Sequence, residues 1–139
     1  MYTFGKQERL CSKKLTDALF LSGQRLMLFP YSIHWMICPQ GTLPSGIPVQ
    51  VLIATSKKKF HHAVDRNRIK RLTRECYRIH KPQLIEYLNS HGITIVLALN
   101  YIHNEIFDYN TLSHKFDRLT DTLIESIEQQ TNPASPSET

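Results

Sequence analysis

The chain has 139 residues, 41% hydrophobic and 21% charged, so it can bury one sizeable core without disulfide or metal staples. Three scattered cysteines with no CxxC pair argue against a disulfide framework and a zinc ribbon. The N-terminus has no apolar signal-peptide core and no window resembles a membrane span, so we expect a cytoplasmic protein with no membrane partner.

The first half of the chain predicts a helix and two strands. Residues 12–22 predict a short helix that Ser12 or Thr16 could cap and that Gly23 ends. Residues 26–38 are rich in aromatic and branched side chains and predict one strand, in which Pro30 marks an edge or a bulge. A turn-rich loop at 39–46 leads to a second predicted strand at 47–55, and we expect the two strands to pair as a hairpin.

A basic helix is predicted from about residue 62 to 79. Its apolar side chains recur every three or four residues and predict one buried stripe, made of Ile69, Leu72, Cys76 and Ile79. Lys81-Pro82 is expected to interrupt this helix, with a further turn from Pro82 to Asn89. Residues 56–81 carry ten basic and two acidic side chains, whereas residues 82–139 carry two basic and eight acidic ones.

The remaining elements complete an α+β pattern. Residues 93–100 are strongly apolar and predict a buried central strand, and 110–129 predict an amphipathic helix. We expect a two-layer sandwich in which about three helices pack on one small mixed sheet. Residues 1–130 would form one domain, and the polar segment 131–139 a disordered tail.

The density of positive charge on one predicted helix indicates a phosphate-binding surface. Each Lys or Arg that meets a phosphate releases condensed counterions, and a helix with a buried face holds such charges in a fixed array. A bZIP region is excluded because no heptad zipper follows Lys81-Pro82, and flanking strands disfavour a helix-turn-helix. RNA, which is read through its shape, its phosphates and its single strands, is the favoured partner.

Protein-based catalysis is not expected. His61 and His62 are adjacent and diverge on a helix, so a zinc site is not predicted. The acids at the end of the chain, Asp117, Asp121, Glu125 and Glu128, are interpreted as a solvated face opposite the apolar one. A stand-alone nuclease would need several of them to hold Mg²⁺. We therefore predict no catalytic and no metal-binding residue in the protein.

Segment 56–75, SKKKFHHAVDRNRIKRLTRE, resembles the RNR signature of the bacterial ribonuclease P protein subunit. The matching positions are Ser56, Lys57, Lys58, Ala63, Val64, Arg66, Asn67, Arg68, Lys70, Arg71, Arg74 and Glu75. The N-terminal pattern F-x-K-x-E-R-L is also present, at Phe4, Lys6, Glu8, Arg9 and Leu10, as are Leu19, Phe20 and Gly23 of the first helix. The chain departs from the family pattern at Thr16, Phe60, His61 and His62.

The resemblance implies a left-handed βαβ crossover, an exception to the usual handedness. It also implies an endoribonuclease whose catalysis resides in an RNA partner, which removes the 5′ leader from precursor tRNA with Mg²⁺ held mainly by the RNA and no organic cofactor. The residues expected to bind the RNA are Lys57, Lys58, Lys59, Arg66, Asn67, Arg68, Lys70, Arg71 and Arg74. Phe20, Tyr31 and Trp35 are expected at the single-stranded leader. An RNA-binding assembly factor or ribosomal-type protein is the alternative.

Overall fold

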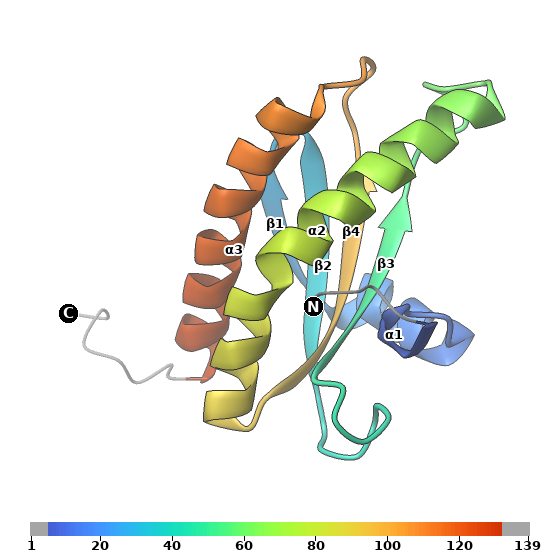
Figure 1. Cartoon of the computed structure of the whole chain (residues 1–139). Helices are drawn as coiled ribbons and strands as arrows, with labels where there is room; N and C mark the ends of the chain where they lie inside the picture. Colours follow the sequence, from blue (N-terminus) through green and yellow to red (C-terminus); the bar gives the residue numbers. More distant parts are fainter. Residues whose placement is uncertain (1–5, 132–139) are drawn as a thin grey trace.

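The computed structural model describes residues 6–131. Phe4 and nearly all of the predicted tail lie outside this range. The elements in chain order are a 3₁₀ turn η1 (Lys6–Glu8), α1 (Lys13–Ser22), β1 (Gln24–Leu28), β2 (Tyr31–Cys38), β3 (Val49–Ala54), α2 (Ala63–His91), β4 (Thr94–Tyr101) and α3 (Tyr109–Thr131). The predicted α+β class is confirmed, with three helices on one mixed sheet (Figure 1).

The strands form one sheet in the order β1-β2-β4-β3. β4 pairs antiparallel with β2 and parallel with β3, and is central as predicted. Its alternate residues face opposite layers: Ile95, Leu97 and Leu99 join the core beneath α2 and α3, whereas Val96 and Ala98 join a smaller core with α1. Because both faces of β4 are covered, its sequence is apolar throughout instead of alternating.

The connection from β3 through α2 to β4 is left-handed. In Figure 1, α2 lies in front of the sheet, both strands run upward, and β4 lies to the left of β3. A right-handed crossover would place the second strand to the right. The handedness that the family resemblance implies is therefore present.

The predicted strand at 26–38 is two strands. A turn at Phe29-Pro30, whose peptide bond is cis, separates β1 from β2, and the two strands pair antiparallel. Pro30 lacks a backbone donor and is therefore better suited to a turn than to a ladder position. The expected hairpin between the strands at 26–38 and 47–55 is also wrong, because β4 lies between β2 and β3.

The predicted interruption at Lys81-Pro82 does not occur, since α2 continues for 29 residues with Pro82 inside it. Leu84 and Leu88, beyond the proline, are buried in the core that α2 shares with α3. Their packing outweighs the lost backbone hydrogen bond. The buried stripe also differs from the prediction at its end, because Ile79 is 42% exposed and the neighbouring Tyr77 is buried.

The continuous helix leads to a stability prediction for Pro82→Ala. Alanine restores the backbone donor and removes the ring's clash, so we expect the free energy of unfolding to rise by about 1–3 kcal/mol in urea titrations. Pro44→Ala, in the exposed loop after β2, is the control and should change stability by less than about 1 kcal/mol. A Pro82→Ala protein no more stable than the parent would contradict a helix held intact by packing.

Candidate RNA interface

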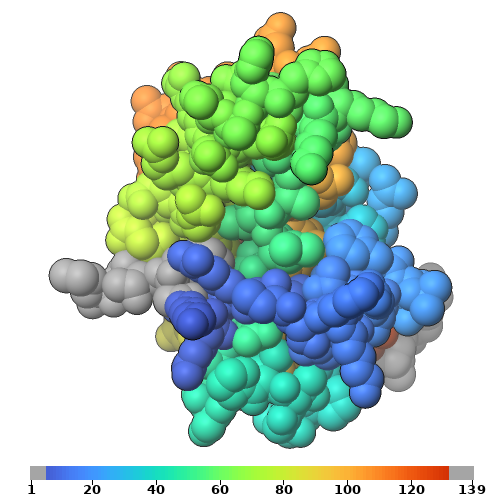
Figure 2. Space-filling view, turned by 90° about the vertical axis from the view of Figure 1, so that its right-hand side faces the viewer, coloured from blue at the N-terminus to red at the C-terminus, as the bar shows by residue number. Residues whose placement is uncertain are grey.

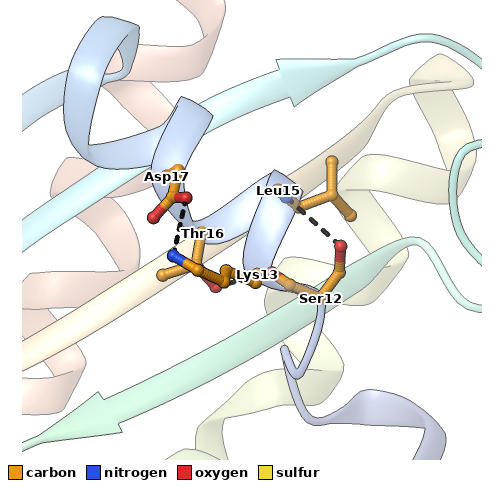
Figure 3. Close-up of polar contacts among 5 residues, drawn as sticks. All are labelled: Ser12, Lys13, Leu15, Thr16 and Asp17. Carbon is orange, nitrogen blue, oxygen red and sulfur yellow. Dashed lines mark hydrogen bonds and ion pairs between the residues drawn. The ribbon is translucent and has the colours of Figure 1, made fainter.

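Helix α1 begins at a capped turn. The Oγ of Ser12 accepts a hydrogen bond from the backbone N–H of Leu15 at 3.2 Å, and Lys13 pairs with Asp17 at 3.1 Å (Figure 3). The hydroxyl of Thr16 donates to the carbonyl of Ser12 at 2.8 Å. Of the two predicted capping residues, Ser12 is thus the N-cap. This start fixes the rotation of α1, which buries Leu19 against the sheet.

A surface of mixed aromatic, apolar and basic side chains lies beside α1 on the sheet face away from α2 and α3. Phe20 is 46% exposed, and its ring meets the ring of His34 edge-on at 4.8 Å between centroids. His34 pairs with Arg25 across β1 and β2, and Met27, two residues along β1, is also exposed. The ring of Phe20 is thus accessible from solvent, and its contact with the leader stays a prediction. We call Phe20, Arg25, Met27 and His34 the α1 surface.

Burial lowers the pKa of His34, and the guanidinium of Arg25 lowers it further. The ring is therefore neutral at neutral pH and offers an uncharged aromatic face. His34, Arg25 and Met27 were absent from the predicted site. The alternation of β2 could have indicated His34, because Ile33 and Trp35 point together to one face and His34 to the other.

The expectation that Tyr31 and Trp35 line the leader surface is corrected. Their side chains are 0% and 3% exposed and lie in the core beneath α2 and α3. The hydroxyl of Tyr31 is 2.7 Å from that of Thr73, and its ring meets Phe116 edge-on. Burial raises the pKa of the Tyr31 phenol far above its usual range. Both aromatics point to the opposite side of the sheet from Phe20.

The predicted RNA-binding residues lie at the start of α2 and on the loop before it. Exposed members are Lys57, Lys58, Lys59, Asn67, Arg68 and Arg71, and half-buried members are Arg66, Lys70 and Arg74. Two of them also have internal roles. Arg66 donates to the carbonyls of Phe60 and His61, at 2.8 and 2.9 Å, and Lys59 donates to the carbonyl of Ile102. Phe60 itself is buried, which anchors the loop of Lys57, Lys58 and Lys59 next to α2. We call these three residues the lysine loop.

A hollow of about 220 Å³ opens at the edge of β3, where α2 faces the N-terminal segment. Figure 2 shows this side, with the blue N-terminal segment crossing below the green surface of α2. Three cationic side chains, those of Arg9, Lys70 and Arg74, line the hollow together with Leu10, Cys11 and residues 51–53. Arg9 was not among the predicted site residues, although it belongs to the N-terminal motif.

The N-terminal segment is fixed to the body by several contacts. The backbone N–H of Leu10 donates to the carbonyl of Val51 at 2.9 Å, and the side-chain amide of Gln50 donates to the carbonyl of Gln7 at 2.8 Å. Glu8 forms an ion pair with the buried Lys81 of α2, at 2.5 Å. Arg9 is consequently held close to the basic face of α2, although more than sixty residues separate it from Arg74.

Two of the acids on α3 contact α2. Asp117 accepts a hydrogen bond from His80 at 2.7 Å, and Asp121 accepts one from the amide of Gln83 at 2.9 Å. Within residues 6–131, no group of three or more His, Cys, Asp and Glu side chains is placed to hold a metal ion. In the same range no helix is both long and apolar enough to cross a membrane.

This geometry is that of an α+β protein with a cationic helix beside a partly open sheet face, a combination suited to binding RNA. The sequence model of the family "Ribonuclease P" matches residues 4–123. The ribonuclease P protein component of Porphyromonas gingivalis is 30% identical over 118 residues, 84% of each chain. That of Chlorobium phaeobacteroides is 37% identical over 102 residues, 70% of each chain. The chain therefore belongs to the ribonuclease P protein family.

The fold agrees with this assignment. A Staphylococcus aureus RNase P protein, a mutant with defective mRNA degradation activity, superposes with a TM-score of 0.63 at 17% identity. The match covers 85% of this chain and 89% of that one. The protein is accordingly an RNA-binding subunit of ribonuclease P, and its enzymatic activity is that of the holoenzyme.

The corrected position of Tyr31 leads to a prediction for Tyr31→Phe. This change removes the hydroxyl that pairs with buried Thr73, so we expect a loss of about 1–2 kcal/mol in the free energy of unfolding. Binding of precursor tRNA, measured in the holoenzyme, should not change. Normal stability combined with weaker binding of leader-bearing substrate would instead place Tyr31 at the RNA.

Proposed function

We propose that this protein acts in the cytoplasm and assists a catalytic RNA in removing the 5′ leader from precursor tRNA. In this proposal it binds the RNA subunit through the basic face of α2 and the leader through the α1 surface. One observation carries the proposal: the hollow at the edge of β3 is lined both by basic side chains of α2 and by Leu10 and Cys11, which directly precede α1. The segment that leads into α1 is thus adjacent to the basic face of α2, which supports a path for RNA from that face to the α1 surface.

The basic face of α2 would hold phosphates. Arg68 and Arg71 are exposed and project from a helix whose other side is buried, so the backbone loses little conformational entropy when they bind. Guanidinium groups can contact phosphate oxygens in pairs. Lys70 and Arg74 line the hollow with Arg9, which places three cations around a space large enough for a phosphate group. Arg66 would chiefly position the lysine loop, through its two carbonyl contacts.

The α1 surface would take single-stranded RNA. The exposed ring of Phe20 beside the neutral ring of His34 offers a place for one base to stack, without strong sequence preference. Arg25, which faces His34 across the strands, would meet a nearby phosphate. Met27 supplies a flexible apolar contact.

We assign the chemical step to the RNA partner, with Mg²⁺ held mainly by RNA. The protein would contribute by binding and orienting the leader relative to the RNA subunit and by reducing the repulsion between their phosphates. The contacts of Asp117 and Asp121 with α2 support a structural role for these two acids. An RNA-binding assembly factor would share the basic face but would not change cleavage.

Phe20→Ala should weaken the binding of leader-bearing precursor tRNA to the holoenzyme by roughly tenfold, since a base stacked on an aromatic ring contributes about 1–3 kcal/mol. Binding of mature tRNA without a leader should be unchanged. Leu21→Ala is the matched control, because Leu21 is the next residue of α1 and its side chain is almost fully exposed. Equal losses with both RNAs would identify Phe20 as a residue of general structural importance.

The three cysteines supply a second test, because Cys11 is exposed and lines the hollow, whereas Cys38 and Cys76 are buried. Burial raises the pKa of Cys38 and raises that of Cys76 to about 12, so iodoacetamide should modify only Cys11 in the folded protein. Addition of ribonuclease P RNA should slow this reaction at least severalfold.

The control for this protection is Ser90→Cys in a Cys11→Ser background, which places an exposed thiol near the opposite end of α2. Its alkylation should be the same with and without RNA. Equal alkylation rates of Cys11 in the free and RNA-bound protein would show that the RNA does not cover the hollow.

A further inference from the structure

A second group of aromatic side chains lies at the end of the sheet where β1 turns into β2 and β4 leads to α3. Phe29 is 46% exposed, and its ring meets His103 at 4.8 Å and Phe107 at 6.0 Å between centroids, edge-on in both contacts. His103 and Phe107 are tilted against each other at 4.7 Å. We call these three residues the aromatic platform.

Hydrogen bonds hold the two segments of the platform in place. The backbone N–H of Ile102 donates to the carbonyl of Pro30 at 2.8 Å, which ties the loop after β4 to the turn between β1 and β2. The buried hydroxyl of Tyr101 donates to the carbonyl of Glu105 at 2.7 Å and accepts from the backbone N–H of Phe107 at 3.1 Å. A rigid aromatic surface loses little conformational entropy when it binds a partner.

Positive charge adjoins the platform. Lys59 donates to the carbonyl of Ile102, the residue before His103, and Lys57 and Lys58 are exposed on the same loop. Figure 1 shows that the loop after β4 and the start of α2 lie at the same end of the molecule. Of the two acids in the loop, Asp108 caps α3 by accepting from the N–H of Thr111 at 2.9 Å, and Glu105 is exposed. Aromatic rings beside lysines favour a nucleobase and its phosphate.

The platform is separate from Phe20 and His34 of the α1 surface. Phe20 and His34 lie on the face of the sheet that α1 partly covers, whereas Phe29 lies in the turn at one end of the sheet. The platform shares that end with the lysine loop and the start of α2, which the proposed function assigns to the RNA subunit. This position favours the RNA subunit over the leader as its occupant.

We propose that the aromatic platform stacks one unpaired base of the ribonuclease P RNA, while Lys57–Lys59 bind the adjoining phosphates. The inference rests on the proposed function. It adds a contact with a base to an interface whose other proposed contacts join Lys and Arg side chains to phosphates. Stacking is tolerant of sequence, so any unpaired base that the RNA presents at this point fits.

The test is the affinity of the protein for ribonuclease P RNA, measured without precursor tRNA at several salt concentrations. Phe29→Leu keeps an apolar side chain but removes the ring, and should raise Kd roughly tenfold. The dependence of log K on log salt should stay unchanged because no phosphate contact is lost, whereas Lys59→Ala should lower the slope by about one. Leu21→Ala, which changes an exposed apolar side chain outside both surfaces, is the control and should bind like the parent.

A second variant, Phe29→Trp, keeps the ring and should bind RNA as tightly as the parent. Its indole emission should be quenched by RNA, against the background of Trp35, which is buried. If Phe29→Leu bound the RNA with the affinity of the parent, or if RNA did not alter the emission of Phe29→Trp, the proposal that the platform stacks a base would be overturned. A Phe29→Leu effect seen only with precursor tRNA would place the leader there and overturn the assignment to the RNA subunit. Failure of the parent protein to bind the RNA would instead overturn the proposed function itself.

Discussion

The interface depends on the packing of one face of α2 against the sheet and α3. Ile69, Cys76, Leu84 and Leu88 are buried along that face, and the helix continues through Pro82 because of it. The same segment without this packing would be a flexible polycation, which could bind phosphates but could not hold them at fixed positions. Because β3 and β4 are parallel, the basic start of α2, which follows β3, lies at the same end of the molecule as the loop after β4 (Figure 1).

Features that repeat within one element were predictable. The basic helix, the central strand β4 and the amphipathic α3 each follow from the spacing of apolar residues over eight or more positions. Features that depend on pairing between distant segments were not. The sequence shows that Tyr31 and Trp35 are aromatic, which favours contact with RNA bases. It does not show the face of the sheet to which they point, because that depends on the turn at Pro30 and on the register with β4.

The candidate site illustrates the same division. The RNR segment was recognisable because its charges lie within twenty residues, yet the partners of Arg66 and Lys59 are backbone carbonyls that no charge pattern reveals. Arg9 joins Lys70 and Arg74 only because the N-terminal segment hydrogen-bonds to the edge of β3. His34 of β2 becomes part of the α1 surface only because its ring contacts that of Phe20 on α1.

The central claim is that the protein contributes binding and orientation to a reaction that RNA performs. The most direct measurement is cleavage of precursor tRNA at low Mg²⁺ by ribonuclease P RNA alone, by the protein alone and by the two together. We predict efficient cleavage only in the mixture, at the junction between leader and mature tRNA. Cleavage by the protein alone, or a mixture no faster than its cognate RNA, would contradict the account.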